Sequence, residues 1–293
     1  MRRSEVRAEG LLLLTAAIWG LAFVTQRIGM KHVGPFTFNG LRFVLGCLPL
    51  APFLIARHRA GGQRLDRGTI ARGAALGVVL FGAASLQQIG LVYTTAGKAG
   101  FITGLYVVMV PLFGIAVGQC ASAGQWGGAL AATAGLYLLS VTGGLSMAPG
   151  DLLVLGSAAV WAVHLLLIGS LAQRIHWSVL AFLQFGTCAV LSLLTAGCLE
   201  TVTAAALVAV APPLLYAGLM SVGVGYTLQV VGQRHAQPVP AAIILSLEAV
   251  FAALGGWILL RELLSPRQLS GCALMLAGML ASQLAPSRDG EST

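Results

Sequence analysis

Glu248 is the only acidic residue that lies deep within an apolar segment of this 293-residue sequence. A carboxyl group there can carry a proton, or it can be the buried partner of another polar group. Arg42 lies inside a different apolar segment. Its guanidinium can have a structural role, pair with Glu248, extend toward water, or meet the carboxylate of a ligand. These two side chains are the candidates for carrying a proton or binding a charged group.

Other polar and aromatic residues of the apolar segments recur at i+3, i+4 and i+7 spacings, which place side chains on one face of a helix. Polar groups in an apolar surrounding cost free energy unless they face protein or water, so these faces predict a polar pathway. The faces consist of Thr15, Trp19 and Gln26; Ser157, Trp161 and His164; Ser221, Gly225, Gln229 and Gln233; Ser85 and Gln88; and Thr103 and Tyr106.

Seven of these residues are predicted to line the pathway and contact a small-molecule substrate: Trp19, Gln88, Tyr106, Trp161, His164, Gln229 and Glu248. Each has a structural alternative. The tryptophans can pack or anchor the protein at a membrane surface. His164 can be a hydrogen-bonded packing residue, and Gln229, like Gln87, can join neighbouring helices.

Motifs for other kinds of chemistry are missing from the sequence. No GxxxxGK[ST] phosphate loop is present, which argues against direct use of ATP. No HExxH, GxSxG or aspartate pair indicates a membrane-embedded enzyme, and no selectivity filter or ring of charge indicates a channel. The five cysteines form no CxxC pair, so packing is the favoured role for them. We therefore expect no enzyme activity, no cofactor and no bound metal.

The elements that hold these residues are expected to be membrane-spanning helices. Of all residues, 57% are hydrophobic and 9% charged, with a mean hydropathy of +0.89, whereas soluble domains carry about 25% charged residues. A spanning helix needs about 20 mostly apolar residues. Ten segments qualify: 10–30, 35–56, 71–93, 97–118, 124–142, 150–171, 178–198, 211–233, 239–260 and 268–285. The first is predicted to be a retained helix rather than a cleaved signal peptide.

Arginine and lysine gather on the cytoplasmic side of membrane proteins. With the N-terminus in the cytoplasm, that side carries eleven of them: Arg2, Arg3, Arg7, Arg57, Arg59, Arg64, Arg67, Arg72, Arg174, Arg234 and Arg288. The opposite side carries five: Arg27, Lys31, Lys98, Arg261 and Arg267. Both termini are thus predicted to be cytoplasmic. The net charge of +8 is then a topology signal and a contact for anionic lipid, not for nucleic acid.

An offset of 142 residues aligns the first half of the chain with the second. It places AAIWG at 16–20 on AAVWA at 158–162, and LRF at 41–43 on LQF at 183–185. Further matches are Leu86-Gln87 with Leu228-Gln229, Gly90 with Gly232, Ala99 with Ala241 and, after one extra residue, Gly128 and Gly135 with Gly271 and Gly278. The sequence therefore predicts two five-helix repeats, at residues 1–147 and 148–293.

Because five is odd, the second repeat must cross the membrane in the opposite orientation to the first. The predicted fold class is an all-α polytopic membrane protein with ten transmembrane helices in two inverted five-helix repeats. Inverted repeats are typical of secondary transporters, in which the two halves exchange conformations and the substrate lies near the midplane between them.

The chain also resembles a known family. The early AxxWG at 16–20, GLRF at 40–43, the Leu-Glu of the ninth span and the five-plus-five order resemble EamA-type members of the drug/metabolite transporter superfamily. Among these it is most similar to YddG-type exporters of aromatic amino acids. The family commonly has Leu-Glu-Pro where this chain has Leu247-Glu248-Ala249. A kink in the ninth span is therefore not assured, although Pro111 can bend the fourth.

The expected function is export of amino acids, including aromatic and other apolar ones, or related small metabolites across a bacterial inner membrane by alternating access. The aromatic and amide lining suits a zwitterion with an apolar side chain. It also suits a flat organic cation, so multidrug or organic-cation export is the alternative. The expected partners are the substrate and membrane lipid, without nucleic acid or ATP, and a monomer is compatible with the sequence.

Overall fold

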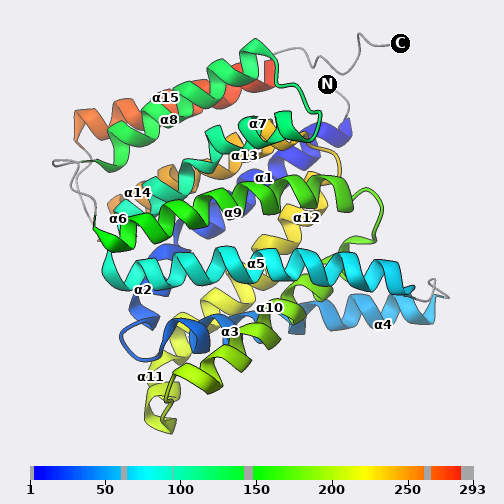
Figure 1. The fold of residues 1–293 in the computed structure, drawn as a ribbon. Coiled ribbons are helices and arrows are strands. Elements are labelled where there is room, and N and C mark those ends of the chain that lie inside the picture. Colours follow the sequence, from blue (N-terminus) through cyan, green and yellow to red (C-terminus); the bar gives the residue numbers. More distant parts are fainter. Residues whose placement is uncertain (1–2, 61–64, 95, 142–147, 261–264, 285–293) are drawn as a thin grey trace.

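A computed structural model describes residues 3–60, 65–94, 96–141, 148–260 and 265–284. Within these ranges the chain is helical and forms no strand. Its helices run back and forth across one bundle, and the start of α1 and the end of α15 lie at the same end of it (Figure 1).

The first half contains α1 (Arg3–Gly20), α2 (Ala22–Gly29), α3 (Pro35–Cys47), η1 (Leu48–Leu50), α4 (Ala51–Arg59), α5 (Arg67–Tyr93), α6 (Ala96–Gly104), α7 (Tyr106–Ala116) and α8 (Ala123–Ser140). The second contains α9 (Pro149–Leu171), α10 (Trp177–Leu199), α11 (Ala204–Leu215), η2 (Tyr216–Tyr226), α12 (Thr227–Gln233), α13 (Pro238–Ser246), α14 (Glu248–Leu260) and α15 (Pro266–Leu284).

The lengths and hydropathy of these helices fit a membrane. In the described ranges seven helices are long and apolar enough to cross one: Ser4–Gly29, Pro35–Arg59, Arg67–Tyr93, Lys98–Ala116, Pro149–Leu171, Trp177–Leu199 and Ala204–Gln233. Pro238–Leu254 is a shorter apolar helix. The expected class, an all-helical multi-pass membrane protein, is confirmed. The count of ten spans stays a prediction, because α8 and α15 are not among the seven.

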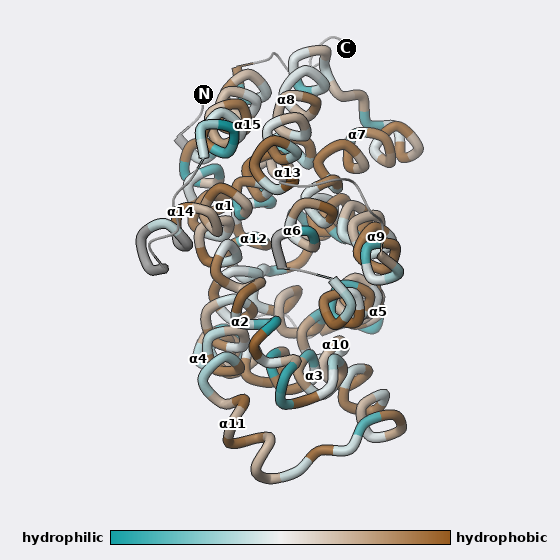
Figure 2. Tube along the Cα trace, turned by 90° about the vertical axis from the view of Figure 1, so that its left-hand side faces the viewer, coloured by the Kyte–Doolittle hydropathy of each residue, from teal (hydrophilic) through white to brown (hydrophobic). Residues whose placement is uncertain are grey.

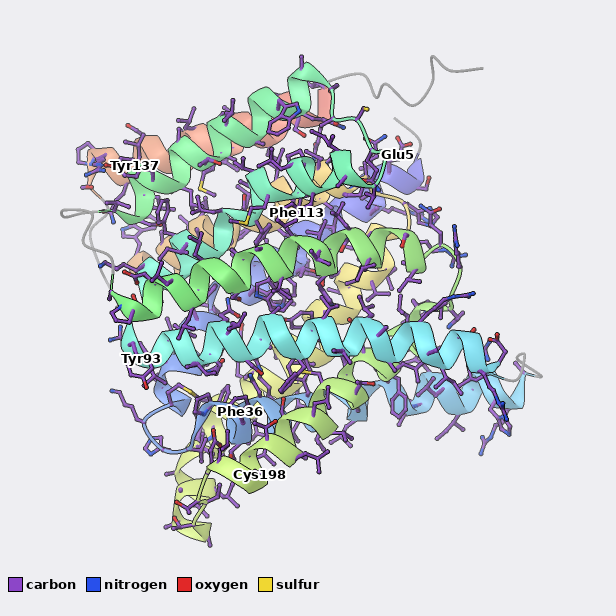
Figure 3. The ribbon with its side chains drawn as sticks, viewed as in Figure 1. Glu5, Phe36, Tyr93, Phe113, Tyr137 and Cys198 are labelled. Carbon is purple, nitrogen blue, oxygen red and sulfur yellow. The ribbon has the colours of Figure 1, made fainter. Side chains whose placement is uncertain are left out.

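The outer surface of the bundle is apolar, as lipid contact requires. Leu194 is 63% exposed and Val208 is 76% exposed, and Figure 2 shows hydrophobic colouring along most of α7. Tyr93 and Tyr137 are exposed at one end of the bundle, and Glu5 lies at the other (Figure 3). Tyrosine is enriched at membrane–water interfaces, so this placement suits a bundle that spans the bilayer.

Some sequence expectations concern residues that the structure does not describe. The expected boundary between the repeats, at residue 147, lies outside the described residues. So do four of the basic residues used to predict orientation, Arg2, Arg64, Arg261 and Arg288.

The expected fourth and ninth spans are interrupted at corresponding positions. α6 and α7 are separated by Leu105, and α13 and α14 by Leu247. Both leucines keep right-handed helical dihedrals, with φ −62° and ψ −13° at Leu105 and φ −63° and ψ −7° at Leu247. Their N–H groups donate to carbonyls three residues back, those of Ile102 and Ile244, which tightens the helix locally. The ninth span is therefore interrupted without a proline, and the fourth is interrupted at Leu105, with Pro111 inside α7.

The first and eighth spans also depart from a regular α-helix. α1 and α2 are separated by Leu21. Opposite them, η2 is a π-helix of 11 residues that follows Pro212 and Pro213 in α11. Proline has no N–H to donate, and π-helical segments are rare and often occur at functional sites. At the 142-residue offset, the matching parts of α9 and α5 are continuous α-helix.

Glycines allow α8 and α15 to cross closely. A Cβ added at Gly128 would lie 2.6 Å from the carbonyl oxygen of Gly278, and one added at Gly135 would lie 2.6 Å from that of Gly271. The reverse contacts, from α15 onto α8, are equally close, at 2.7 and 2.6 Å. Only residues without a side chain permit this approach of two backbones. Gly128 and Gly135 of α8 therefore pack backbone against backbone on Gly278 and Gly271 of α15.

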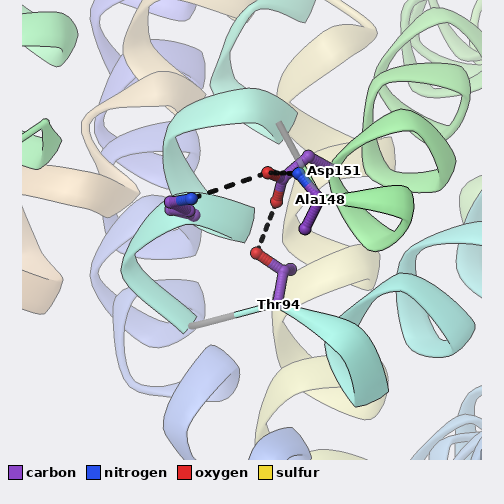
Figure 4. A network of polar contacts seen from close by, with 4 residues as sticks. Thr94, Ala148 and Asp151 are labelled. Carbon is purple, nitrogen blue, oxygen red and sulfur yellow. Dashed lines mark hydrogen bonds and ion pairs between the residues drawn. The ribbon is translucent and has the colours of Figure 1, made fainter. Parts of the chain in front are cut away.

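Carboxylates hold the ends of several helices together. Asp151, in the first turn of α9, accepts hydrogen bonds from the Thr94 hydroxyl and the Ala148 N–H, and the Lys98 Nζ lies 3.7 Å from its Oδ2 (Figure 4). Glu200, after α10, accepts from the backbone N–H groups of Phe36 and Thr37, each at 2.8 Å. Such contacts satisfy N–H groups that have no partner inside the helix. They tie α5, α6 and α9 together and seat α10 on α3.

Candidate functional site

A cavity opens between the helices of the bundle. Both halves of the chain contribute to its wall. The lining residues are Trp19, Ala22, Phe23, Gln26, Gln87, Thr103, Tyr106, Trp161, Leu165, Ser221, Tyr226, Gln229, Leu245 and Glu248. The wall thus combines five aromatic side chains with amide, hydroxyl and carboxyl groups.

Tyr226 is the centre of an aromatic cluster. Its ring lies 4.6 Å from that of Trp19, tilted by 54°, and 5.8 Å from that of Trp161, stacked at 26°. On its other side Phe43 and Phe185 lie 6.0 and 6.1 Å away. Rings at these separations attract one another by about 0.5–1.5 kcal/mol beyond the burial of their area. Tyr226 therefore joins the two tryptophans into one aromatic wall.

The two tryptophans are held differently. The Trp19 Nε1–H donates to the carbonyl of Ser221 at 3.1 Å, while the Trp161 Nε1 is buried without a hydrogen-bond partner. The end of α1 at Gly20 leaves its last carbonyls without intrahelical partners. The Tyr216 hydroxyl donates to one of them, that of Ile18, at 2.7 Å. Hydrogen bonds from Tyr216 and to Ser221 thus hold the end of α1, including Trp19, against η2.

The polar part of the lining surrounds Glu248, which begins α14 and is buried. The Gln87 Nε2 donates to the Thr103 hydroxyl at 3.1 Å, whereas the Tyr106 hydroxyl and the Gln229 Oε1 have no hydrogen-bond partner. Buried polar atoms are nearly always satisfied, so such atoms mark places for a ligand or water. Within the described part of the chain, the lining contains one carboxyl group and no cationic side chain.

Five of the predicted pathway residues line the cavity: Trp19, Tyr106, Trp161, Gln229 and Glu248. The structure does not bring the other two to it. His164 is buried with its Nε2 2.9 Å from the Gln184 Oε1, and the Gln88 amide is fully buried without a partner. Gln87 lines the cavity instead, because neighbouring residues of an α-helix point about 100° apart.

Tyr226 is the main cavity residue that sequence reasoning missed. The expected face of the eighth span followed α-helical i+4 spacing, from Ser221 to Gly225 and Gln229. In the π-helix η2 the backbone hydrogen bonds run from residue i to i+5, so each turn holds more residues than in an α-helix, and Ser221 and Tyr226 both face the cavity. The preceding prolines and the glycines within η2 are the only local signals of this change.

The cavity brings together residues that correspond at the 142-residue offset. Ten of the lining residues form five such pairs: Trp19 with Trp161, Phe23 with Leu165, Gln87 with Gln229, Thr103 with Leu245, and Tyr106 with Glu248. Tyr106 and Glu248 are the residues that follow the interruptions at Leu105 and Leu247. Equivalent parts of the two halves thus meet around one space.

A second, larger cavity with an empty volume of about 1160 Å³ lies where α9 ends and α13 begins. Its lining is polar and includes Arg174, Arg234 and His235. In its wall the Gln125 Nε2 donates to the Gln237 Oε1 at 2.8 Å, which joins the first turn of α8 to the start of α13. Among the described residues, no group of three or more His, Cys, Asp or Glu side chains is placed to hold a metal ion.

A bundle of apolar helices around an internal cavity lined by aromatic and polar groups has the architecture of a membrane transport protein. The chain belongs to the EamA-like transporter family, whose model matches residues 6–141 and again residues 148–282. The family resemblance expected from the sequence is confirmed. The protein is accordingly a transporter.

Individual relatives agree with this family. An uncharacterized transporter of Archaeoglobus fulgidus is 32% identical over 278 residues, or 93% of this chain and 84% of the relative. A probable amino-acid metabolite efflux pump of Salmonella typhimurium is 43% identical over 54 residues, 18% of each chain. A solved crystal structure superposes with a TM-score of 0.79, covering 94% of this chain and 98% of its own. It is 20% identical, so it shows a shared fold.

Proposed function

We propose that this protein is a secondary transporter that exports amino acids with aromatic or other apolar side chains across a bacterial inner membrane by alternating access. The observation that carries the proposal is the cavity in which Trp19, Trp161 and Tyr226 form one wall and Glu248 another part of the lining. The rings provide surface for an apolar side chain. The carboxyl group provides a partner for an ammonium group.

Crossed contacts between the halves support their inverted arrangement, with repeats at residues 1–147 and 148–293. By sequence Gly128 corresponds to Gly271, and Gly135 to Gly278. In contact, however, Gly128 meets Gly278 and Gly135 meets Gly271. Equivalent surfaces that meet in this crossed way are related by a two-fold axis. A pseudo-two-fold axis in the membrane plane is what an inverted repeat has.

Differences between equivalent helices support alternating access. The first span is broken at Leu21 and the eighth contains η2, while the equivalent α9 and α5 are regular. Exchanging these two conformations between the halves would move access to the cavity from one side of the membrane to the other. In this proposal the polar second cavity, near Arg174 and Arg234, is the cytoplasmic entrance. Both termini then lie in the cytoplasm.

The substrate class rests on the cavity and on the relatives. The short match to a probable amino-acid metabolite efflux pump favours amino acids, as does the similarity to YddG-type exporters noted from the sequence. Export of organic cations is the second candidate. It is favoured by a specific observation, because the cavity holds one carboxyl group beside aromatic rings and its described lining has no cation.

Transport into liposomes that contain the purified protein distinguishes the two candidates. We expect saturable uptake of L-tryptophan, L-phenylalanine and L-leucine, faster than uptake of glycine and of a planar aromatic cation. The assay is run with and without a pH gradient, and empty liposomes provide the background. Uptake of the cation without uptake of any amino acid would replace the first candidate with the second.

A further inference from the structure

Arg42 is the largest fully buried side chain described in the protein, with 1% of its surface exposed. It lies within α3, in a span that is expected to be surrounded by lipid and protein. Its Nε and Nη2 have no hydrogen-bond partner. The pairing with Glu248 considered from the sequence is not among the ion pairs of the described residues.

The guanidinium is separated from the central cavity by one layer of aromatic rings. Its Cζ lies 5.1 Å from the centre of the Phe43 ring and 5.9 Å from that of Phe38. The Phe43 ring in turn lies 6.0 Å from that of Tyr226, which lines the cavity. The rings of Phe43 and Tyr226 therefore lie between the guanidinium and the cavity.

A cation in this position is costly without an anion. A buried charge without a partner of opposite sign is strongly destabilising, and a cation–π contact returns part of that cost. The two Phe contacts therefore offset part of the cost, while the unbonded Nε and Nη2 still lack acceptors. The groups that match a guanidinium best are carboxylate and phosphate, which it binds through two parallel hydrogen bonds.

The charges of the cavity identify which of these anions fits. An amino acid carries an ammonium and a carboxylate. The described lining supplies Glu248 for the ammonium and no cation for the carboxylate. We propose that Arg42 binds the carboxylate of the substrate when Phe43 and Tyr226 turn aside. This inference rests on the proposed export of amino acids and adds to it a requirement for a carboxylate.

Comparing amino acids with the amines that lack only the carboxylate tests the proposal. Uptake of labelled L-phenylalanine into liposomes is competed with unlabelled L-phenylalanine and with phenylethylamine, and likewise for L-leucine and isopentylamine. We expect the wild-type protein to prefer each amino acid over its amine by at least tenfold. Arg42→Gln should lose most of this preference, and Arg42→Lys should keep part of it, because lysine retains the charge without the fork geometry. Arg72→Gln, on the exposed face of α5, is the matched control.

Labelling of the wild-type protein keeps the proposal testable if the Arg42 variants fail to fold. Phenylglyoxal modifies accessible arginines, and peptide mass spectrometry locates each product. We expect exposed Arg27 and Arg72 to react at once, and Arg42 to react slowly, with several-fold protection by L-phenylalanine and none by phenylethylamine. Two results in a protein that does transport amino acids would overturn this proposal and leave the proposed function standing. They are an Arg42 that phenylglyoxal does not label, and an Arg42→Gln variant that still prefers amino acids over amines as the wild type does. Absence of amino-acid transport by the wild-type protein would overturn the proposed function on which it rests.

Discussion

At the scale of single residues, the two indoles of the cavity wall have equivalent positions but different supports. If the indoles form platforms for the substrate, Trp19→Ala and Trp161→Ala should each weaken binding of bulky substrates several-fold to tenfold. A tenfold loss of affinity corresponds to about 1.4 kcal/mol of binding free energy. Small substrates should be affected less. The measurement is the concentration dependence of uptake into liposomes for L-tryptophan and glycine. Trp257→Ala, which removes an exposed indole from α14, is the matched control.

The hydrogen bond of Trp19 adds a difference between these two variants. Trp19→Ala removes the hydrogen bond from the indole to the Ser221 carbonyl, and such a bond contributes about 0.5–1.5 kcal/mol. Trp161→Ala removes an indole whose Nε1 has no partner. Thermal unfolding in detergent should therefore show the lower Tm for Trp19→Ala. Normal kinetics in both variants, for large and small substrates alike, would show that the indoles only pack.

Glu248 is the cavity residue best placed to couple transport to protons. If it carries them, Glu248→Gln should abolish uptake driven by a pH gradient and leave counterflow exchange present, with a raised KM because the substrate ammonium loses its charged partner. The physical reason is that an amide cannot bind and release a proton, while it keeps the size and polarity of the side chain. Both modes are measured in the same liposomes. Residual uptake that still responds to the gradient, together with a lowered Tm, would assign Glu248 a structural role.

At the scale of elements, the crossing of α8 and α15 depends on glycines that have no room for a side chain. Gly135→Val should be destabilising, because overfilling a packed interface costs about 1–3 kcal/mol. The expected result is a lower Tm in detergent. Gly127→Ala on the same helix is the control, since an added Cβ there meets nothing within 4 Å. An unchanged Tm in Gly135→Val would mean that this crossing contributes little to the fold.

The start of α5 provides a pH-dependent contact outside the membrane spans. Asp66 caps this helix, and the hydrogen bond from Thr69 lowers the pKa of its carboxyl group below the ordinary 3.8. Because the pKa is lower in the folded state, the cap stabilises above the ordinary pKa and loses this effect as pH falls through the folded value. Asp66→Ala should therefore lower the Tm at pH 7, and the difference from wild type should shrink below pH 4. A difference independent of pH would exclude the carboxylate as its cause.

At the scale of the whole molecule, the inverted repeat requires that positions separated by an odd number of spans lie on opposite sides of the membrane. Reporter fusions that end after residue 66 and after residue 148 are separated by three expected spans. We expect the first reporter in the cytoplasm and the second outside it. A fusion after Leu284 provides the reference for the cytoplasmic side. Reporters on one side at 66 and 148 would remove the inverted arrangement and the transport cycle inferred from it.

Much of this architecture was determined by the sequence alone. The apolar segments predicted the helices because hydropathy over about 20 residues is a local property that the bilayer selects directly. The 142-residue offset paired Trp19 with Trp161, and both line the cavity. Their pairing was readable because equivalent positions of a duplicated chain keep the same environment. The transporter family followed from the same signals.

Only the tertiary structure decided which side chains meet. The π-helix η2 turned Tyr226 into the cavity wall, and the choice of Gln87 over Gln88 depended on the rotation of α5 against its neighbours. The interruption at Leu247 arose without a proline. These features depend on contacts between segments far apart in the chain, such as Ile18 with Tyr216. Local spacing does not contain that information, because the rotation and bending of a packed helix are set by the surfaces it packs against.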